Sequence, residues 1–128
     1  MTGGTDGRGA RRPRREAERV VVERFASSLA SAFPDGGREV VGLDAVLVVD
    51  GGARAVSARG RDAVIARLRE LMTPETSVAL ASVNGAYGVA LSRGGNVVGV
   101  ITGEVRSARL STIWVVCAPE KLRHWNAD

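Results

Sequence analysis

Two stretches of the chain repeat apolar residues every three or four positions, which is the period of an amphipathic helix. The first is residues 16–33, and the helix-breaking sequence Pro-Asp-Gly-Gly follows it at residues 34–37. The second is residues 61–72, which lie between a glycine and a Thr-Pro pair. The intervening residues 38–43 fit either a turn of helix or a short extended piece. We therefore expect two helices, the first of them long.

The other patterns are short runs rich in valine or alternations of apolar and polar residues, as in strands. Residues 45–49 form one such run, and residues 54–58 are expected to pair back against it as a hairpin. Asn84-Gly85 is a strong two-residue hairpin signal, because both positions of such a turn need positive φ. The remaining expected elements are strands at residues 77–83, 86–93, 97–105 and 109–117 and one helical turn at residues 120–125.

The order of these elements predicts an α+β fold, with helices first and a four-stranded antiparallel meander last. A strongly curved antiparallel sheet around the long N-terminal helix would form a cone with a pocket at its mouth. The chain has 128 residues, 45% of them hydrophobic, which suits a single domain. We place this domain at residues 16–128 and expect residues 1–15 to be a disordered leader rich in Arg and Gly.

The charge of the chain is concentrated in this leader. Five arginines and one aspartate in residues 1–15 carry the whole formal net charge of +4, so the rest of the chain is neutral. The leader would bind nucleic acid only weakly, through phosphate contacts, because it has no aromatic residue to stack on bases. A solvated linker without a role of its own is the alternative that the composition favours.

The scarcity of cysteine and histidine excludes several kinds of site. Cys117 is the single cysteine and His124 the single histidine, which rules out an internal disulfide, a cysteine-based zinc site and a poly-histidine site. We expect no metal and no cofactor, and we expect Cys117 to be a small buried residue rather than a nucleophile. The apolar runs are short and the N-terminus lacks an apolar signal region. We therefore expect a cytoplasmic protein that does not enter a membrane.

Four segments of the second half resemble a SnoaL-like domain of the NTF2-like superfamily. They are Val-Asn-Gly at residues 83–85, Gly-Asn-Val-Val-Gly-Val at 95–100, Arg-Leu-Ser-Thr-Ile-Trp-Val-Val at 109–116 and Pro-Glu-Lys-Leu at 119–122. More narrowly, the chain resembles the C-terminal extension of extracytoplasmic-function RNA polymerase sigma factors. Those extensions carry Asp-Gly-Gly-Gly-Lys after the first strand and Asn-Pro-Asp-Lys-Leu at the end, which here read Asp-Gly-Gly-Ala-Arg at residues 50–54 and Ala-Pro-Glu-Lys-Leu at residues 118–122. The resemblance covers about residues 10–125, because residues 10–14 are similar to the linker that precedes such extensions.

This resemblance implies that the two motif segments contact a sigma factor or RNA polymerase and tune transcription. The partner-contact candidates are Asp50, Gly51, Gly52, Arg54, Pro119, Glu120, Lys121 and Leu122. Ala53, Arg54 and Ala118 depart from the family's motifs, and the chain holds no promoter-reading domain of its own, so regulation would act in trans or the role has been lost. From the residues alone, the first segment is equally explained as a turn and the second as a docked C-terminus. The resemblance also implies a homodimer formed through the outer sheet face.

An enzyme is the second hypothesis. A glutamate at position 104, desolvated in the cone, would have a raised pKa and would move protons beside a carbonyl, as in isomerases and cyclases of this superfamily. Tyr87 would donate a hydrogen bond to an oxyanion. The pocket candidates are Phe25, Leu29, Asn84, Tyr87, Thr102, Glu104 and Trp114. The alternatives are that Glu104 faces solvent and pairs with an arginine, that Asn84 serves its turn, and that Tyr87 and Trp114 fill the core.

No acid–base pair stands out in the sequence, and catalysis of this kind needs a base and an oxyanion donor in one cavity. The sequence therefore favours a non-catalytic domain that regulates a partner or senses a small apolar molecule. The alternative is a cofactor-free isomerase or cyclase acting on an apolar ketone or polyketide. The observation that discriminates between them is whether Glu104 and Tyr87 meet inside the cone.

Overall fold

The long N-terminal helix, α1, spans Gly3–Ala30 in the computed structural model, which describes the backbone of residues 3–126 and the side chains of residues 14–126. From Gly3 onward the leader, which we expected to be disordered, continues this helix. The arginine side chains of residues 1–13, on which much of the nucleic-acid prediction depends, lie outside the described residues.

The C-terminal end of α1 also differs from the expectation. The apolar pattern extends to Phe33, but the helix ends at Ala30 and Phe33 has a φ of 55°, in the left-handed region. The amide of Phe33 donates a hydrogen bond of 2.7 Å to the carbonyl of Ser28, which closes the helix end as in a Schellman motif. Phe33 is nevertheless fully buried, so its place in the pattern reflects burial rather than helical geometry.

The other elements follow in the expected order. They are β1 (Val41–Asp50), β2 (Ala55–Arg59), α2 (Arg61–Leu71), β3 (Ser77–Val83), β4 (Ala86–Arg93), β5 (Asn96–Arg106), β6 (Arg109–Val116), the 3-10 helix η1 (Pro119–Lys121) and α3 (Arg123–Asn126). The ambiguous residues 38–43 divide into a turn and the start of β1.

All six strands belong to one sheet in the order β2-β1-β6-β5-β4-β3. The neighbouring strands are antiparallel except β1 and β6, which run parallel. The expected antiparallel sheet is therefore a mixed one. Local sequence patterns contain no information about pairing between the first and last strands of the chain, and this is why the parallel pair was not predicted.

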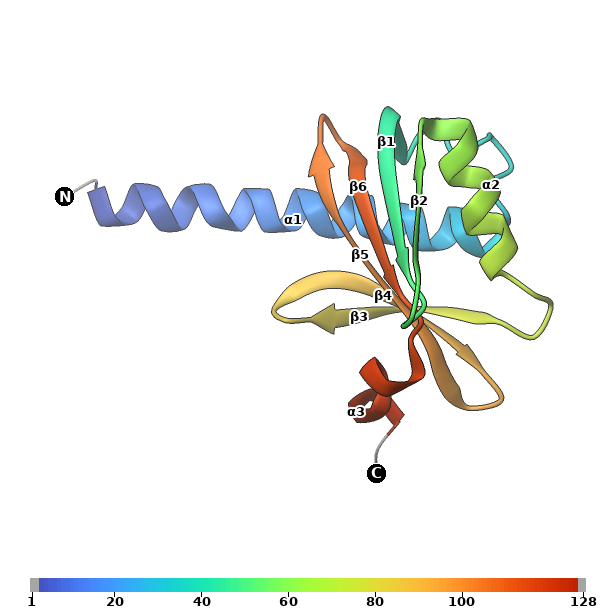
Figure 1. The fold of residues 1–128 in the computed structure, drawn as a ribbon. Helices are drawn as coiled ribbons and strands as arrows, with labels where there is room; N and C mark the ends of the chain where they lie inside the picture. Colours follow the sequence, from blue (N-terminus) through green and yellow to red (C-terminus); the bar gives the residue numbers. More distant parts are fainter. Residues whose placement is uncertain (1–2, 127–128) are drawn as a thin grey trace.

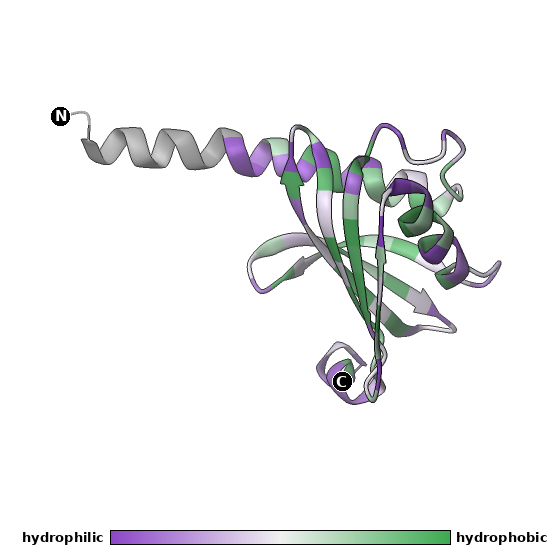
Figure 2. Ribbon diagram, turned by 45° about the horizontal axis from the view of Figure 1, so that its top comes forward, coloured by the Kyte–Doolittle hydropathy of each residue, from purple (hydrophilic) through white to green (hydrophobic). Residues whose placement is uncertain are grey.

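The curved sheet packs around the later half of α1, with α2 beside β1 and β2 (Figure 1). The helical stripe of Val21, Val22, Phe25 and Leu29 packs against apolar side chains of the inner sheet face, and α2 adds its own buried stripe. Hydrophobic residues accordingly line the strands and the part of α1 that they cover (Figure 2). The predicted α+β cone is confirmed.

One end of the sheet gathers the last residues of β1, β4 and β6 and the first residues of β5, and we call this end the base. The C-terminal segment, η1 and α3, lies at the base (Figure 1). The side chain of Asn126 attaches it there, because the amide of Val97 donates to Oδ1 of Asn126 at 2.7 Å and Nδ2 of Asn126 donates to the carbonyl of Val97 at 3.0 Å. The expected C-terminal helical turn is thus split into two short helices that close the base.

Candidate functional site at the base of the sheet

The two segments that we identified as partner contacts meet at the base. Because β1 and β6 are parallel, their carboxyl ends finish side by side, with Asp50 opposite Val116. The amide of Cys117 donates to the carbonyl of Asp50 at 2.9 Å, and a little further along the chain the Lys121 ammonium donates to Oδ2 of Asp50 at 2.5 Å. Residues 50–54 and 118–122 therefore form one unit, which we call the clasp.

Gly52 lies where the first half of the clasp packs against the C-terminal segment. Its φ is 107°, which side chains rarely allow, and its amide donates to Oδ1 of Asp50 at 2.9 Å. A Cβ added here would lie 3.2 Å from Oε2 of Glu120 and 3.5 Å from the Cβ of Ala118. The positive φ of the turn therefore favours glycine at this position, and the C-terminal segment packs directly beside it.

The ion pair perturbs the titration of both of its members. The hydrogen bond from Lys121, followed by the one from the Gly52 amide, lowers the pKa of the Asp50 carboxyl. The same bond raises the pKa of Lys121. The pKa of the Cys117 thiol is raised, first by burial and then by the nearby charge of Asp50. Asp50 and Lys121 are therefore both charged over the neutral pH range, while the Cys117 thiol stays protonated there.

Most of the clasp is accessible to a partner. Gly51, Arg54, Pro119 and Glu120 are exposed, and the side chain of Lys121 is 54% exposed. Leu122 is an exception, because it is 3% exposed and docks the C-terminal segment onto the base. The docking alternative therefore holds for Leu122, which is not available as a partner contact, whereas the other candidates remain on or near the surface.

A cavity of about 450 Å³ opens beside the clasp, between the end of α2 and the base of the sheet. We call it the base cavity. Its walls are mostly apolar, with Leu71 from α2, Leu91 from β4 and Val115 from β6 among them. Arg93 and Asn126 contribute the polar groups of the lining. None of the seven predicted pocket residues lines it.

The two pocket candidates on α1 lie where the interior of the cone is filled by side chains. Phe25 and Leu29 are 1% and 0% exposed, and the ring of Phe25 packs on that of Phe33 with centroids 5.8 Å apart. Both residues were predicted to line a pocket, and both belong to the hydrophobic core instead. The periodicity of α1 showed correctly which side faces the sheet, but it carries no information on whether that side leaves a void.

Three other pocket candidates lie on the outer face of the sheet. Ile101 and Ile113 point into the core, and strand neighbours alternate between faces. Thr102 and Trp114, which pair with each other, therefore face outward, and so does Glu104. Trp114 is 39% exposed and Glu104 is also exposed, so the prediction that they line the cone is wrong.

Tyr87 is the one candidate in the sheet that does face α1. It is half-buried on the inner face, and the guanidinium of Arg15 lies 5.8 Å from its ring centroid. It borders a hollow of about 290 Å³, whose rim includes Glu18 and Glu104. Glu104 reaches that rim from a strand position directed away from α1, so Tyr87 and Glu104 do not meet inside the cone.

Asn84 occupies the first position of the β3–β4 turn. Its φ of 52° and the φ of 82° at Gly85 are those that a two-residue hairpin turn requires. Asn84 is exposed and borders a shallow hollow of about 480 Å³ near the C-terminal segment, outside the cone. The turn interpretation therefore accounts for this residue.

Sequence reasoning did not find the base cavity or its arginine. Arg93 follows the buried run of β4, and nothing in that local pattern shows that α2 and the C-terminal segment lie nearby. The only available signal was a charged residue directly after an apolar strand, which more often marks the strand's exit into solvent.

Comparison with known proteins supports the fold at low sequence identity. No protein-family model and no curated protein matches this chain. An NTF2-like protein of unknown function from Mesorhizobium loti superimposes with a TM-score of 0.63 and 20% identity over 80% of this chain and 92% of its own. The extracytoplasmic-function sigma factor SigJ of Mycobacterium tuberculosis superimposes with a TM-score of 0.61 and 22% identity over 82% of this chain. The match spans 44% of the SigJ chain.

A protein of Kribbella flavida named as a candidate ketosteroid isomerase is also similar, with a TM-score of 0.58 and 16% identity over 79% of this chain and 77% of its own. These likenesses concern the fold. The chain has the NTF2-like fold, and the predicted resemblance to that superfamily is confirmed at this level. In the part of the chain that the structure describes, no helix is long and apolar enough to cross a membrane.

Proposed function

We propose that this domain regulates a partner protein without catalysis, through contacts made by the clasp, and that it senses a small molecule. The observation that carries the proposal is the clasp itself. Asp50 and Lys121 are 71 positions apart in the sequence and form one exposed ion-paired unit at the base. Loops held in place by a rigid sheet are common recognition surfaces.

A sigma factor or RNA polymerase is the partner that we propose. Two features support it: the resemblance of both clasp segments to those of sigma-factor extensions, and the likeness of the fold to part of SigJ. The clasp presents charges of both signs, from Arg54, Glu120 and Lys121, which would select a partner of complementary charge.

We also propose that the domain forms a homodimer through the outer sheet face. Trp114 supports this, because it is a large aromatic side chain that is 39% exposed in the middle of that face. Burying such a residue is a common contribution to an interface.

The enzyme alternative has one supporting observation, the hollow of about 290 Å³ that both Tyr87 and Glu104 border. General acid–base catalysis needs both groups within reach of one substrate. The opposite facing of the two residues in the sheet argues against this and leaves the regulatory proposal better supported.

Native mass spectrometry of the protein purified gently from its own host is the first measurement. It reports bound proteins, bound small molecules and oligomeric state together. We expect a dimer that carries a sigma factor or a polymerase subunit. Purification of a bare monomer under the same gentle conditions would count against both the partner and the dimer.

The role of the clasp is tested on the partner found in this way. Reversing one charge, with Lys121→Glu or Asp50→Lys, should weaken binding about tenfold or more, because like charges then face each other in the clasp. The matched control reverses one charge of the exposed ion pair in α2, in which Nη1 of Arg67 lies 3.2 Å from Oε1 of Glu70. This change should leave the affinity for the partner unchanged. A partner whose affinity neither clasp variant weakens would show that the clasp is not the contact surface.

The enzyme alternative is tested by deuterium exchange next to the carbonyl of cyclohexanone, followed by NMR. The regulatory proposal expects the exchange rate of buffer alone. An acceleration that is lost in Glu104→Gln would replace the proposal with the enzyme, whereas one retained in that variant would clear Glu104 of the role.

A further inference from the structure

The charge of Arg93 is incompletely satisfied within the protein. This half-buried arginine donates from Nε to Oγ1 of Thr76 at 2.7 Å and from an Nη to the carbonyl of Leu71 at 2.8 Å. Both acceptors are neutral, and among the described side chains no carboxylate lies within 4.0 Å of the guanidinium. A guanidinium has five N–H donors in a planar fork, so the two bonds leave donors for a further acceptor.

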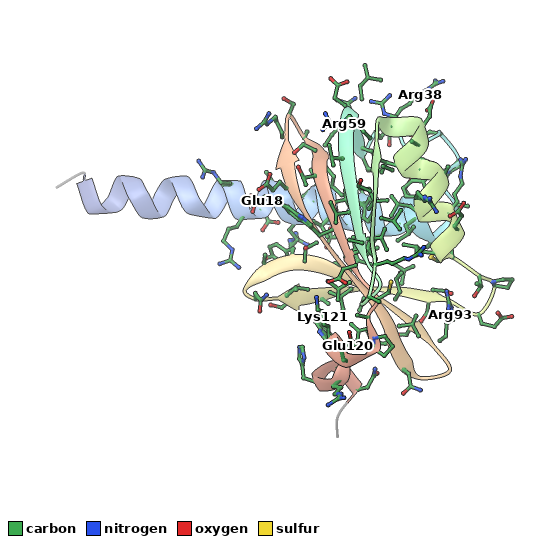
Figure 3. The ribbon with its side chains drawn as sticks, viewed as in Figure 1. Glu18, Arg38, Arg59, Arg93, Glu120 and Lys121 are labelled. Carbon is green, nitrogen blue, oxygen red and sulfur yellow. The ribbon has the colours of Figure 1, made fainter. Side chains whose placement is uncertain are left out.

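The surroundings of Arg93 are mostly apolar. It lines the base cavity, whose volume of about 450 Å³ lies within the range of small-molecule sites. Leu91, Val98 and Val115 face the same space. The two bonds to Thr76 and Leu71 fix the guanidinium at the end of α2, so its position is set before any ligand arrives (Figure 3). A fixed cation at the rim of an apolar cavity is the complement of a molecule with one anionic group and an apolar body.

We propose that the base cavity binds an organic carboxylate, with the carboxylate on Arg93 and the apolar body against Leu91, Val98 and Val115. This inference rests on the proposed function, because it names the chemical class of the small molecule that the domain senses. No residue of α1 lines the cavity, although Leu91 and Val115 also belong to the hydrophobic core.

The position of the cavity explains how a ligand would influence the clasp. Pro119 and Leu122 belong to the wall of the cavity, and they flank Glu120 and Lys121 of the clasp. A ligand that packs against this wall restrains the short helix η1, which carries the exposed charges. Binding in the cavity is therefore expected to order the partner surface.

The single cysteine provides a direct reporter of occupancy. Cys117 is half-buried and lines the base cavity, so a bound ligand should shield its thiol. The experiment measures the alkylation rate of the full chain by iodoacetamide, a neutral reagent that does not compete for Arg93. The probe is decanoate, and 1-decanol is the neutral molecule of matched length.

We expect decanoate to slow alkylation at least tenfold at saturation, and decanol to bind at least tenfold more weakly. Arg93→Gln should raise the Kd for decanoate about tenfold or more, because a hydrogen bond to a charged group is lost. Arg93→Lys should retain most of the affinity. Arg109→Gln is the matched control, since Arg109 also donates to a backbone carbonyl, at 2.7 Å to Arg38, but lies outside the cavity. Its Kd for decanoate should stay unchanged, which shows that the loss in Arg93→Gln is not a general effect of removing one positive charge.

Val97→Phe is a second variant that keeps Arg93 and narrows the cavity, in case Arg93→Gln does not fold. It should abolish protection of Cys117 by decanoate. Equal binding of decanoate and decanol, or unchanged binding in both Arg93→Gln and Val97→Phe, would overturn the proposal. These outcomes are independent of the partner test. If decanoate does not bind, the clasp variants still report on partner binding. If the clasp variants do not change partner affinity, the result for decanoate still holds.

Discussion

The interior of the cone and the base of the sheet are built from the same strands but fill their space differently. In the interior, Phe25, Leu29, Leu47 and Ile113 are at most 1% exposed. At the base, the strands end around a cavity of about 450 Å³ and a clasp held by an exposed ion pair. The interior therefore maintains the fold, and the base provides the space and charge on which the proposed recognition depends.

The difference follows from what covers each region. Helix α1 covers the interior with a continuous stripe of large apolar side chains. The base is covered by η1 and α3, which have three and four residues and present few large side chains. A short segment closes the end of a sheet without filling it. Three predictions test this contrast between the interior and the base.

The largest effect is expected from truncating the interior. Phe25→Ala removes a fully buried ring and should lower the free energy of unfolding by about 3–5 kcal/mol. Val97→Ala, in the wall of the base cavity, should lower it by about 1 kcal/mol or less, because its side chain is only half-buried. Urea denaturation of both variants measures the difference. Equal losses would show that the interior is packed no better than the base.

Two glycines of β5 provide a second, smaller contrast. A Cβ at Gly103 would lie 2.8 Å from the carbonyl oxygen of Thr112 and 2.9 Å from Cδ2 of Leu110. Gly103→Ala should therefore lower the free energy of unfolding by about 1–3 kcal/mol. At Gly99, beside the base cavity, the nearest atom is Cδ1 of Leu91 at 3.4 Å. Gly99→Ala should leave the free energy of unfolding nearly unchanged. Thermal unfolding of the two variants shows whether the packing against β5 differs between these two positions.

The smallest effect is expected from the ion pair of the clasp. The pKa of Asp50 is lowered, so its contribution to stability is present above the unfolded value of about 3.9 and is lost as the pH falls through the folded value. The pKa of Lys121 is raised, so its contribution is present below the unfolded value of about 10.4 and is lost as the pH rises through the folded value. Both are present between about pH 4 and pH 10.

Asp50→Asn should therefore lower the melting temperature slightly at pH 7, and this effect should shrink as the pH falls through the folded pKa of Asp50. NMR titration of the Asp50 carboxyl gives a direct measurement. Lys121→Met should raise its pKa toward the ordinary value, while the bond from the Gly52 amide retains part of the shift. An unchanged pKa in Lys121→Met would mean that the ion pair is not maintained in solution.

Elements that depend on local chemistry could be predicted closely. The strands on either side of Asn84-Gly85 have the expected boundaries, because that turn sets the register of its hairpin. Helix α2 lies within one residue of its expected bounds, between a glycine that begins it and a proline that follows it. The two clasp segments were also identified in advance, from the resemblance to sigma-factor extensions.

Features that depend on distant contacts could not be predicted. The parallel pairing of β1 with β6 joins the first and last strands of the chain, and the clasp exists because of it. The outward facing of Glu104 depends on a register that includes a bulge between Glu104 and Val105. The alternation of residues along β5 did place Glu104 on the face of Thr102, but could not show which face that was.

The sequence by itself determined the helices, the hairpins and the fold class. These follow from periodicity and turn chemistry, which act over a few residues, whereas the two clasp segments were identified from a resemblance to a known family. The tertiary structure decided that the interior is filled, that Asp50 meets Lys121, and that Arg93 faces an apolar cavity. Each of these depends on which distant side chains occupy the same volume, and that is fixed only when the sheet closes around α1 and the C-terminal segment docks on its base.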